Sequence, residues 1–129
     1  MHARFFLLIF TTLWAFSCRP SGPEEIPLPT KICLLTSHHG QPIPRAKVWI
    51  KYNTDTFPGY QQPPSFFDAS FETGADAHGC IAPVPEGQHW LIAFGYDSLH
   101  YPNYVYGSML VQVSVAYKPV IDTIMYVSE

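Results

Sequence analysis

The chain has 129 residues, of which 47% are hydrophobic and 16% aromatic, and seven Lys and Arg stand against ten Asp and Glu. This length allows one domain. The net charge of −3 and the lack of any basic run argue against nucleic-acid binding, because phosphate contacts need clustered Lys and Arg.

The first segment in chain order is typical of an export signal. Arg4 is followed by the twelve uncharged residues FFLLIFTTLWAF, and then by Ser17 and Cys18. A membrane-spanning helix needs roughly 20 apolar residues, so this shorter run fits the hydrophobic region of a secretory signal. A small residue before a cysteine here resembles the lipobox of bacterial lipoproteins, in a looser form similar to that of Bacteroidota. The resemblance implies a signal peptide over residues 1–17, lipidation of Cys18 and an anchor in the outer membrane. The anchored protein would face either the periplasm or the outside of the cell. Secretion without an anchor is the alternative.

Residues 18–30 form the expected tether. They contain four prolines and one glycine, and proline fixes φ and donates no backbone hydrogen bond. The segment is therefore expected to be extended and semi-rigid. The folded domain would span residues 31–129, which is enough chain for one modest core.

Short strands are expected throughout this domain. The clearest covers residues 45–52, RAKVWIKY, in which alternate residues are apolar, so that one face of the strand meets the core and the other meets water. The expected strands cover residues 31–36, 45–52, 67–73, 80–84, 89–96, 109–117 and 120–127. About seven short strands favour an all-β, two-sheet antiparallel sandwich, because a single sheet would leave one apolar face in water.

Two longer connections and one pair of cysteines complete the domain. Residues 53–66 carry three prolines and several aromatics, and residues 97–107 carry three tyrosines. Loops of this length are often functional. In an oxidising compartment, Cys33 and Cys80 can form a disulfide, worth about 3–4 kcal/mol on the chain-entropy model. Two separate buried thiols are the alternative.

Three turn motifs resemble those of carboxypeptidase regulatory-like domains. They are GQPIPRAKV over residues 40–48, TGADAHG over 73–79 and PEGQHWL over 85–91, although Arg45 stands where that family often has glycine. The resemblance covers nearly all of residues 31–127 and implies a transthyretin-like (prealbumin-like) or Ig-like sandwich. It also implies an accessory module on secreted and lipid-anchored proteins that usually lacks catalytic residues.

A metal site is considered at one end of the expected sandwich. If the strands alternate up and down, the loops 37–44, 74–79 and 97–107 share that end. They carry His38, His39, Asp76, His78, Asp97 and His100, and imidazole with carboxylate suits zinc or copper. Adjacent His38 and His39 would point to opposite sides of an extended chain, which favours solvated turn residues. We therefore expect no metal and no cofactor, with a site at His38, His78 and His100 as the alternative.

Catalysis is not expected. Transthyretin-like hydroxyisourate hydrolases share the sandwich and end in Tyr-Arg-Gly-Ser, whereas this chain ends in MYVSE. A Gly-x-Ser-x-Gly motif is also absent from the sequence. Asp68 and Glu72 are the nearest candidate carboxylate pair, and they are expected on an exposed strand face.

Binding through aromatic side chains is the favoured activity. Exposed aromatic residues commonly form protein or sugar contacts, and the candidates here are Trp49, Tyr60, Tyr101, Tyr104 and Tyr106. The alternative is that the loops fold onto the sandwich and that lysine stems cover Trp49. The sequence thus predicts a non-catalytic envelope lipoprotein that serves as a protein-interaction or structural module, with a glycan-binding accessory protein as the alternative. Its partners would be the membrane, through the lipid, and an unidentified protein or polysaccharide.

Overall fold

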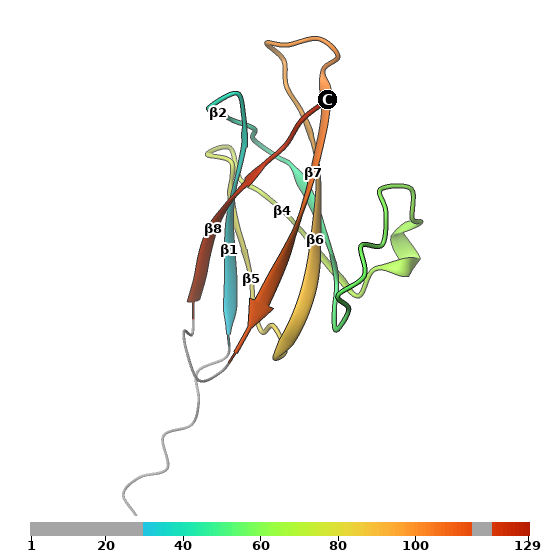
Figure 1. The fold of residues 1–129 in the computed structure, drawn as a ribbon. Coiled ribbons are helices and arrows are strands. Elements are labelled where there is room, and N and C mark those ends of the chain that lie inside the picture. Colours follow the sequence, from blue (N-terminus) through green and yellow to red (C-terminus); the bar gives the residue numbers. More distant parts are fainter. Residues whose placement is uncertain (1–29, 115–119) are drawn as a thin grey trace, which may run out of the picture.

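The computed structural model describes residues 30–114 and 120–129, which form a two-layer β-sandwich (Figure 1). The strands are β1 (Lys31–His38), β2 (Gln41–Pro42), β3 (Lys47–Lys51), β4 (Ala69–Glu72), β5 (His78–Ile81), β6 (Gly87–Tyr96), β7 (Tyr104–Val113) and β8 (Val120–Tyr126). The expected signal peptide (1–17) lies outside the described residues, as does the expected tether (18–30) apart from Thr30. Within the described ranges, the helical element is a 3₁₀ turn over Pro64–Phe66, and no helix is long and apolar enough to cross a membrane.

The predicted all-β sandwich is confirmed. In one sheet β1 pairs with β2, β5 and β8, and the other sheet has the order β4-β3-β6-β7. All pairs are antiparallel except β1 and β8, which run parallel from Lys31 opposite Val120 to Ser37 opposite Tyr126. Apart from the short β2, the strands alternate in direction along the chain, and this alternation leaves β1 and β8 pointing the same way. Since these two strands are neighbours in one sheet, they pair in parallel.

The core lies between the two sheets and follows the period-two pattern of the sequence. On β3, Val48 and Ile50 are buried, while Lys47, Trp49 and Lys51 lie half-buried on the outer face. The core residues are Ile32, Leu34, Ile43, Ala46, Val48, Ile50, Val84, Leu91, Ala93, Val105, Val111, Val113, Met125 and Val127. At about 25 cal/mol per Å² of buried apolar surface, these side chains provide the main stabilisation of the fold.

Every predicted strand differs from the observed one at one or both ends, and two strands differ the most. The last strand of the β4-β3-β6-β7 sheet was expected over residues 109–117 but runs from Tyr104 to Val113, because a continuous ladder pairs Tyr104 with Tyr96 at one end and Val113 with Gly87 at the other. Tyr104 and Tyr106, which were expected in a loop, therefore lie on β7, while Tyr101 lies in the loop between β6 and β7. The strand expected over residues 80–84 begins earlier, at His78, and ends at Ile81.

Of the two alternatives for the cysteines, the structure has the disulfide. Cys33 on β1 lies directly opposite Cys80 on β5, and the two sulfurs are bonded. The bond ties two neighbouring strands of the same sheet together.

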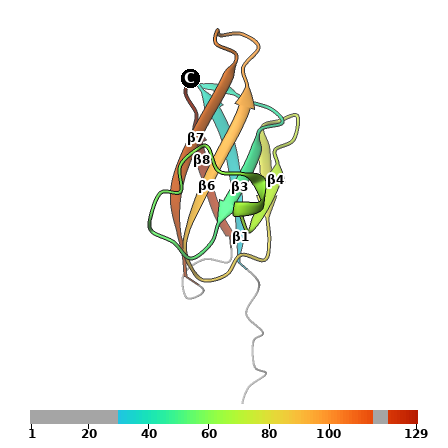
Figure 2. The same ribbon diagram turned by 90° about the vertical axis from the view of Figure 1, so that its right-hand side faces the viewer.

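The loop over residues 52–68 covers the outer face of the β4-β3-β6-β7 sheet, in front of β3 and β6 in Figure 2. The Tyr60 hydroxyl hydrogen-bonds the Ser108 hydroxyl at 3.0 Å, and the Trp90 indole N–H donates to the Asp55 carbonyl at 3.1 Å. Because the loop lies here, Ile92 is fully buried although it points away from the inter-sheet core.

Candidate functional site

One end of the sandwich gathers three segments that are distant in sequence. The end of β1 with its turn to β2, the loop between β6 and β7, and the residues after β8 all lie at the upper end in Figure 1. The residues after β8 reach the other sheet, because Tyr106 and Ser128 exchange two backbone hydrogen bonds. That crossing brings Glu129 beside the end of β1.

Asp97 is the centre of a side-chain cluster at this end. It is 3% exposed, and its Oδ2 lies 2.7 Å from His38 Nδ1 and 2.8 Å from His100 Nδ1. The His38 ring, the Leu99 amide and the His100 ring all donate to this carboxylate, and together they hold the pKa of Asp97 well below its usual range. Because an ionised carboxylate only accepts hydrogen bonds, Nδ1 of both histidines carries a proton.

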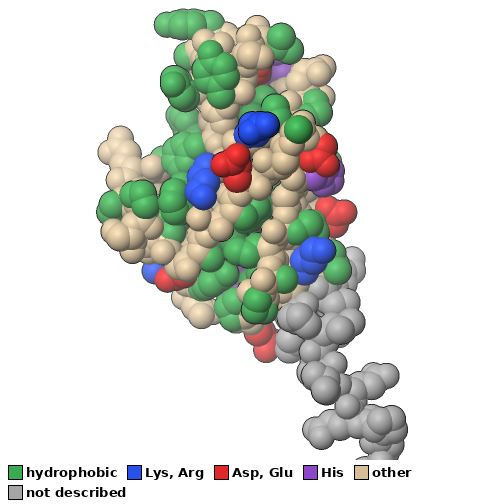
Figure 3. All heavy atoms as spheres, turned by 180° about the vertical axis from the view of Figure 1, so that it is seen from behind, with side chains coloured by type: hydrophobic (Ala, Val, Ile, Leu, Met, Phe, Trp, Pro, Cys, Tyr) green, Lys and Arg blue, Asp and Glu red, His purple; other side chains and the backbone are tan. Residues whose placement is uncertain are grey.

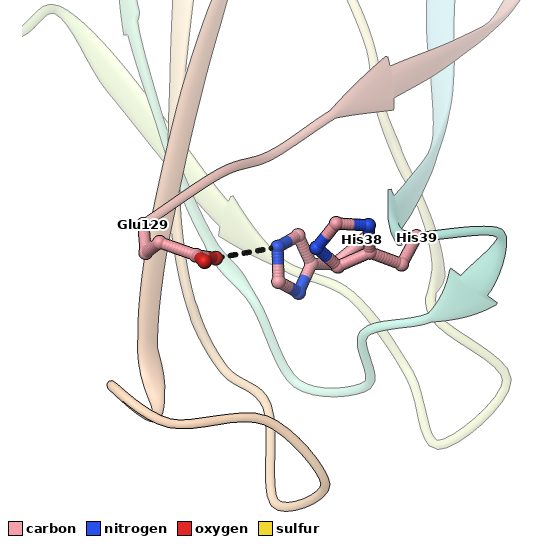
Figure 4. Close-up of side chains that lie close together, drawn as sticks. All are labelled: His38, His39 and Glu129. Atoms are coloured by element: carbon pink, nitrogen blue, oxygen red, sulfur yellow. Dashed lines mark ion pairs between the residues drawn. The ribbon is translucent and has the colours of Figure 1, made fainter.

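The other nitrogen of His38 faces a second carboxylate. His38 is 3% exposed, and its Nε2 lies 2.9 Å from Oε2 of Glu129, which is 44% exposed (Figure 4). The His38 ring is therefore held between Asp97 on one side and Glu129 on the other. We name His38, His39, Asp97, His100 and Glu129 the histidine cluster.

His39 joins this cluster because the chain turns there. His38 pairs with Gln41, so His39 and Gly40 form a two-residue hairpin loop, and both have positive φ, 48° and 77°. The His39 ring centre lies 4.2 Å from that of His38 and 5.3 Å from that of His100. The expectation that His38 and His39 point to opposite sides is wrong, since His39 is not extended.

The structure brings together only part of the predicted histidine set. His38 and His100 meet, and their rings lie 5.6 Å apart. His78 lies outside the cluster. It is on β5, opposite Leu35 of β1, and lines a shallow pocket with Asp122. Glu129 was missed from the sequence, because no local pattern announces that residues after the last strand return to the first.

An open pocket of about 350 Å³ adjoins the histidine cluster. Residues 41–45 line one side of it, and residues 96–99 line the other. The lining residues thus include one aromatic residue, Tyr96, together with the polar residues Arg45, Gln41 and Ser98. The loop after Tyr96 is braced by Asn103, whose amide donates to the Asp97 and His100 carbonyls.

Exposed aromatic side chains gather beside this pocket, at the hairpin between β6 and β7. Tyr101 is 90% exposed and Tyr104 is 77% exposed, and the Tyr104 ring packs edge-to-face on Tyr96 at 5.5 Å. Seen from the opposite side, hydrophobic side chains crowd the same end of the molecule (Figure 3). We name the three tyrosines Tyr96, Tyr101 and Tyr104, together with the exposed Leu99 between them in the sequence, the hairpin aromatic surface.

The other predicted binding residues, Trp49, Tyr60 and Tyr106, make packing contacts on the outer face of the sheet. Trp49 stacks on Phe67 at 5.6 Å with the Lys47 ammonium 5.0 Å from its ring centre, which matches the alternative that lysine covers it. Tyr60 and Tyr106 pack on each other at 4.6 Å and hold the loop against the sheet. Tyr96, at the end of the strand expected over residues 89–96, was not among the predicted binding residues, although it is exposed and lines the pocket.

Comparison with known proteins adds a similar fold. No protein-family model matches the chain, and no curated protein matches it. Among solved structures, the crystal structure of a "putative carbohydrate binding protein" from Pseudomonas aeruginosa is similar, with a TM-score of 0.50 and 11% identity. The similarity covers 76% of this chain and 88% of the other, and at this identity it supports the sandwich fold.

Proposed function

We propose that this protein is a non-catalytic, carbohydrate-binding module of the bacterial envelope. The observation that carries the proposal is the pocket between residues 41–45 and 96–99, with the exposed hairpin aromatic surface at its rim. Its volume of about 350 Å³ lies within the range of small-ligand pockets.

The chemistry of this pocket suits a sugar. A sugar ring has one apolar face that packs on an aromatic ring and hydroxyl groups around its edge that need hydrogen-bond partners. Tyr96, half-exposed and supported by Tyr104, offers the ring. Arg45 and Gln41 offer donors on the facing side, and the braced loop after Tyr96 lowers the entropic cost of ordering the site.

The likeness in fold to a protein described as carbohydrate binding supports the proposal. The sequence resemblance to regulatory-like domains fits as well, since such domains are accessory modules. We infer the same lipid-anchored location in the outer membrane that the lipobox-like sequence implies.

A glycan array tests the proposal, with the full chain as the probe. We expect the protein to bind at least one glycan on the array. Tyr96→Ala and Arg45→Ala should each weaken the affinity for that glycan by about tenfold or more. Tyr126→Ala is the matched control, because Tyr126 is 72% exposed but does not line the pocket. The proposal fails if no glycan binds, or if Tyr96→Ala binds as tightly as the unchanged protein while both remain folded by thermal melting.

Protein interaction is a second candidate, favoured by a different observation. Tyr101 is 90% exposed at the tip of the hairpin and does not line the pocket, and exposed tyrosine is common at protein interfaces. Pull-down from envelope extracts with Tyr101→Ala as the comparison separates the two. This candidate is favoured if the unchanged chain captures a protein that Tyr101→Ala does not capture, and if the unchanged chain binds no glycan on the array.

The anchor is tested separately. Cells that express the unchanged chain should incorporate radiolabelled palmitate into it, and cells that express Cys18→Ala should not. Equal labelling of the two would remove the lipoprotein assignment without touching the proposed pocket.

A further inference from the structure

We propose that the histidine cluster binds a divalent transition metal, zinc or copper, through His38 Nε2, a ring nitrogen of His39 and the carboxylate of Glu129. The nitrogen and oxygen atoms of these three residues lie within 4.8 Å of one another. The site does not depend on carbohydrate binding, and its test is independent of the glycan array.

The contact between His38 and Glu129 needs a positive charge. His38 Nδ1 carries the proton that it donates to Asp97, so a neutral His38 ring has a lone pair on Nε2. That lone pair faces a Glu129 carboxylate oxygen at 2.9 Å, and two lone pairs at this distance repel. A second ring proton on Nε2 or a metal ion between the two atoms removes this repulsion, and the two carboxylates that flank the ring attract either cation.

Asp97 gives His38 the support that metal-binding histidines have. Such a histidine typically donates its other ring N–H to a carboxylate, which fixes the ring and makes the ligating nitrogen more basic. Asp97 does this for His38 at 2.7 Å from a buried position. His100 shares the same carboxylate at 2.8 Å and packs near both other rings, which limits how the cluster can rearrange.

The three ligands need only a small movement to close around an ion. Zinc holds nitrogen and oxygen ligands at about 2.0–2.1 Å, which puts tetrahedral ligand atoms about 3.3 Å apart. His38 is fixed by burial, whereas the side chains of His39 and Glu129 are exposed, so small rotations of these two side chains can bring them to the ion. Imidazole with one carboxylate suits zinc or copper better than calcium or magnesium, which prefer all-oxygen sites.

A second group of three, His38, Asp97 and His100, also has ligand atoms within 4.8 Å. Its nitrogen and oxygen atoms already meet at hydrogen-bond distances, 2.7 and 2.8 Å. An ion there would have to break both hydrogen bonds around two side chains that are 3% exposed. The open side at Nε2 is therefore the site.

Isothermal titration calorimetry with Zn²⁺ tests the site. The protein is the full chain in detergent, with Cys18→Ala in every variant and a tag that contains no histidine, so that neither a free thiol nor the tag binds metal. We expect one equivalent of Zn²⁺ at micromolar or tighter affinity, and a loss of about tenfold or more in His39→Ala and in Glu129→Gln. Both residues are exposed, so these variants should remain folded. His78→Ala is the matched control and should bind as the parent does, because His78 lies outside the cluster.

Electron paramagnetic resonance of the Cu²⁺ form gives a second readout. We expect nitrogen hyperfine structure from two imidazoles in the parent and from one in His39→Ala. The proposal is overturned if the parent binds neither ion, if His39→Ala and Glu129→Gln bind as the parent does, or if His78→Ala removes binding. A failed glycan array would leave these results unchanged.

Discussion

At the scale of single residues, the same residue type does different work according to its neighbours. His89 is fully buried, and both of its ring nitrogens have hydrogen-bond partners. Its Nδ1 accepts from the Asn53 amide and its Nε2–H donates to the Pro85 carbonyl. His38 is equally buried but lies between two carboxylates. His78 is exposed. Nothing in the residue types separates these three histidines, so burial and partners decide which of them offers chemistry.

Asp68 provides a prediction at this scale. It closes the loop over residues 52–68, because its carboxylate accepts from the Tyr52 amide at 2.8 Å and from the Lys51 ammonium at 3.0 Å. Partial burial raises the pKa of Asp68, but the Tyr52 and Lys51 contacts outweigh it and hold the pKa below its usual value. Asp68→Ala should lower the free energy of unfolding by about 1 kcal/mol at pH 7, a small value because the pair is partly exposed.

The pH dependence of that difference follows from the direction of the shift. A carboxyl with a lowered pKa in the folded state stabilises the fold above its unfolded pKa of about 3.9, and this contribution is lost as the pH falls through the folded pKa. The free energies of unfolding in urea should therefore differ at pH 7, and the difference should be smaller at pH 3. A difference that is the same at both pH values would contradict the role given to the ionised carboxylate.

At the scale of elements, the residues after β8 connect the two sheets and complete the histidine cluster. They approach β7 at Gly107, where a Cβ atom would lie 2.6 Å from the Tyr126 carbonyl oxygen and 3.1 Å from the Val127 Cα. The φ of Gly107 is not positive, so its backbone conformation does not require glycine. Glycine is needed here because the two backbones approach closely. The position of Glu129 beside His38 therefore depends on a residue of another strand.

Gly107→Ala tests this dependence. The added methyl group meets backbone atoms that cannot turn aside, so we expect the free energy of unfolding to fall by about 1–3 kcal/mol, as for other overpacked sites. The same variant should weaken Zn²⁺ binding in calorimetry, because Glu129 is displaced. Gly59→Ala is the control for a glycine substitution, since its surroundings are open, although its φ of 83° also adds some strain. Wild-type stability of Gly107→Ala would show that the residues after β8 are not held at this point.

At the scale of the whole molecule, two features hold the β1 sheet together. The parallel pairing of β1 with β8 joins the first and last strands described. The disulfide between Cys33 and Cys80 joins β1 to β5, with a sequence separation of 47 residues. Such contacts between distant residues are slow to form, because the loop must close before they stabilise anything.

The disulfide gives the prediction at this scale. Closing a loop of this length is worth about 4 kcal/mol on the chain-entropy model, so the Cys33→Ser, Cys80→Ser double variant should unfold at a much lower denaturant concentration. Reduction of the unchanged protein with dithiothreitol should produce the same shift. Equal midpoints for the oxidised and reduced proteins in guanidinium chloride would contradict a stabilising bond.

Local sequence alone determined the approximate position of most strands, most of the turns and the class of fold, although it misplaced the ends of β5 and β7. Alternation at period two is a property of consecutive residues, so β3 was recognised from RAKVWIKY and its buried face followed. Glycine in a turn acts locally as well, and Gly40, in the turn after β1, has a positive φ of 77°. Ile43, in the motif that follows, is buried among the core residues.

The tertiary structure alone decided the pairing of β1 with β8 and the membership of the histidine cluster. His38, Asp97 and Glu129 come from three segments far apart in the chain. Their meeting depends on which sheet each strand joins and on where the last residues cross between sheets. Those choices are set by the total burial of apolar surface and by close backbone contacts such as that at Gly107, which no single stretch of sequence contains.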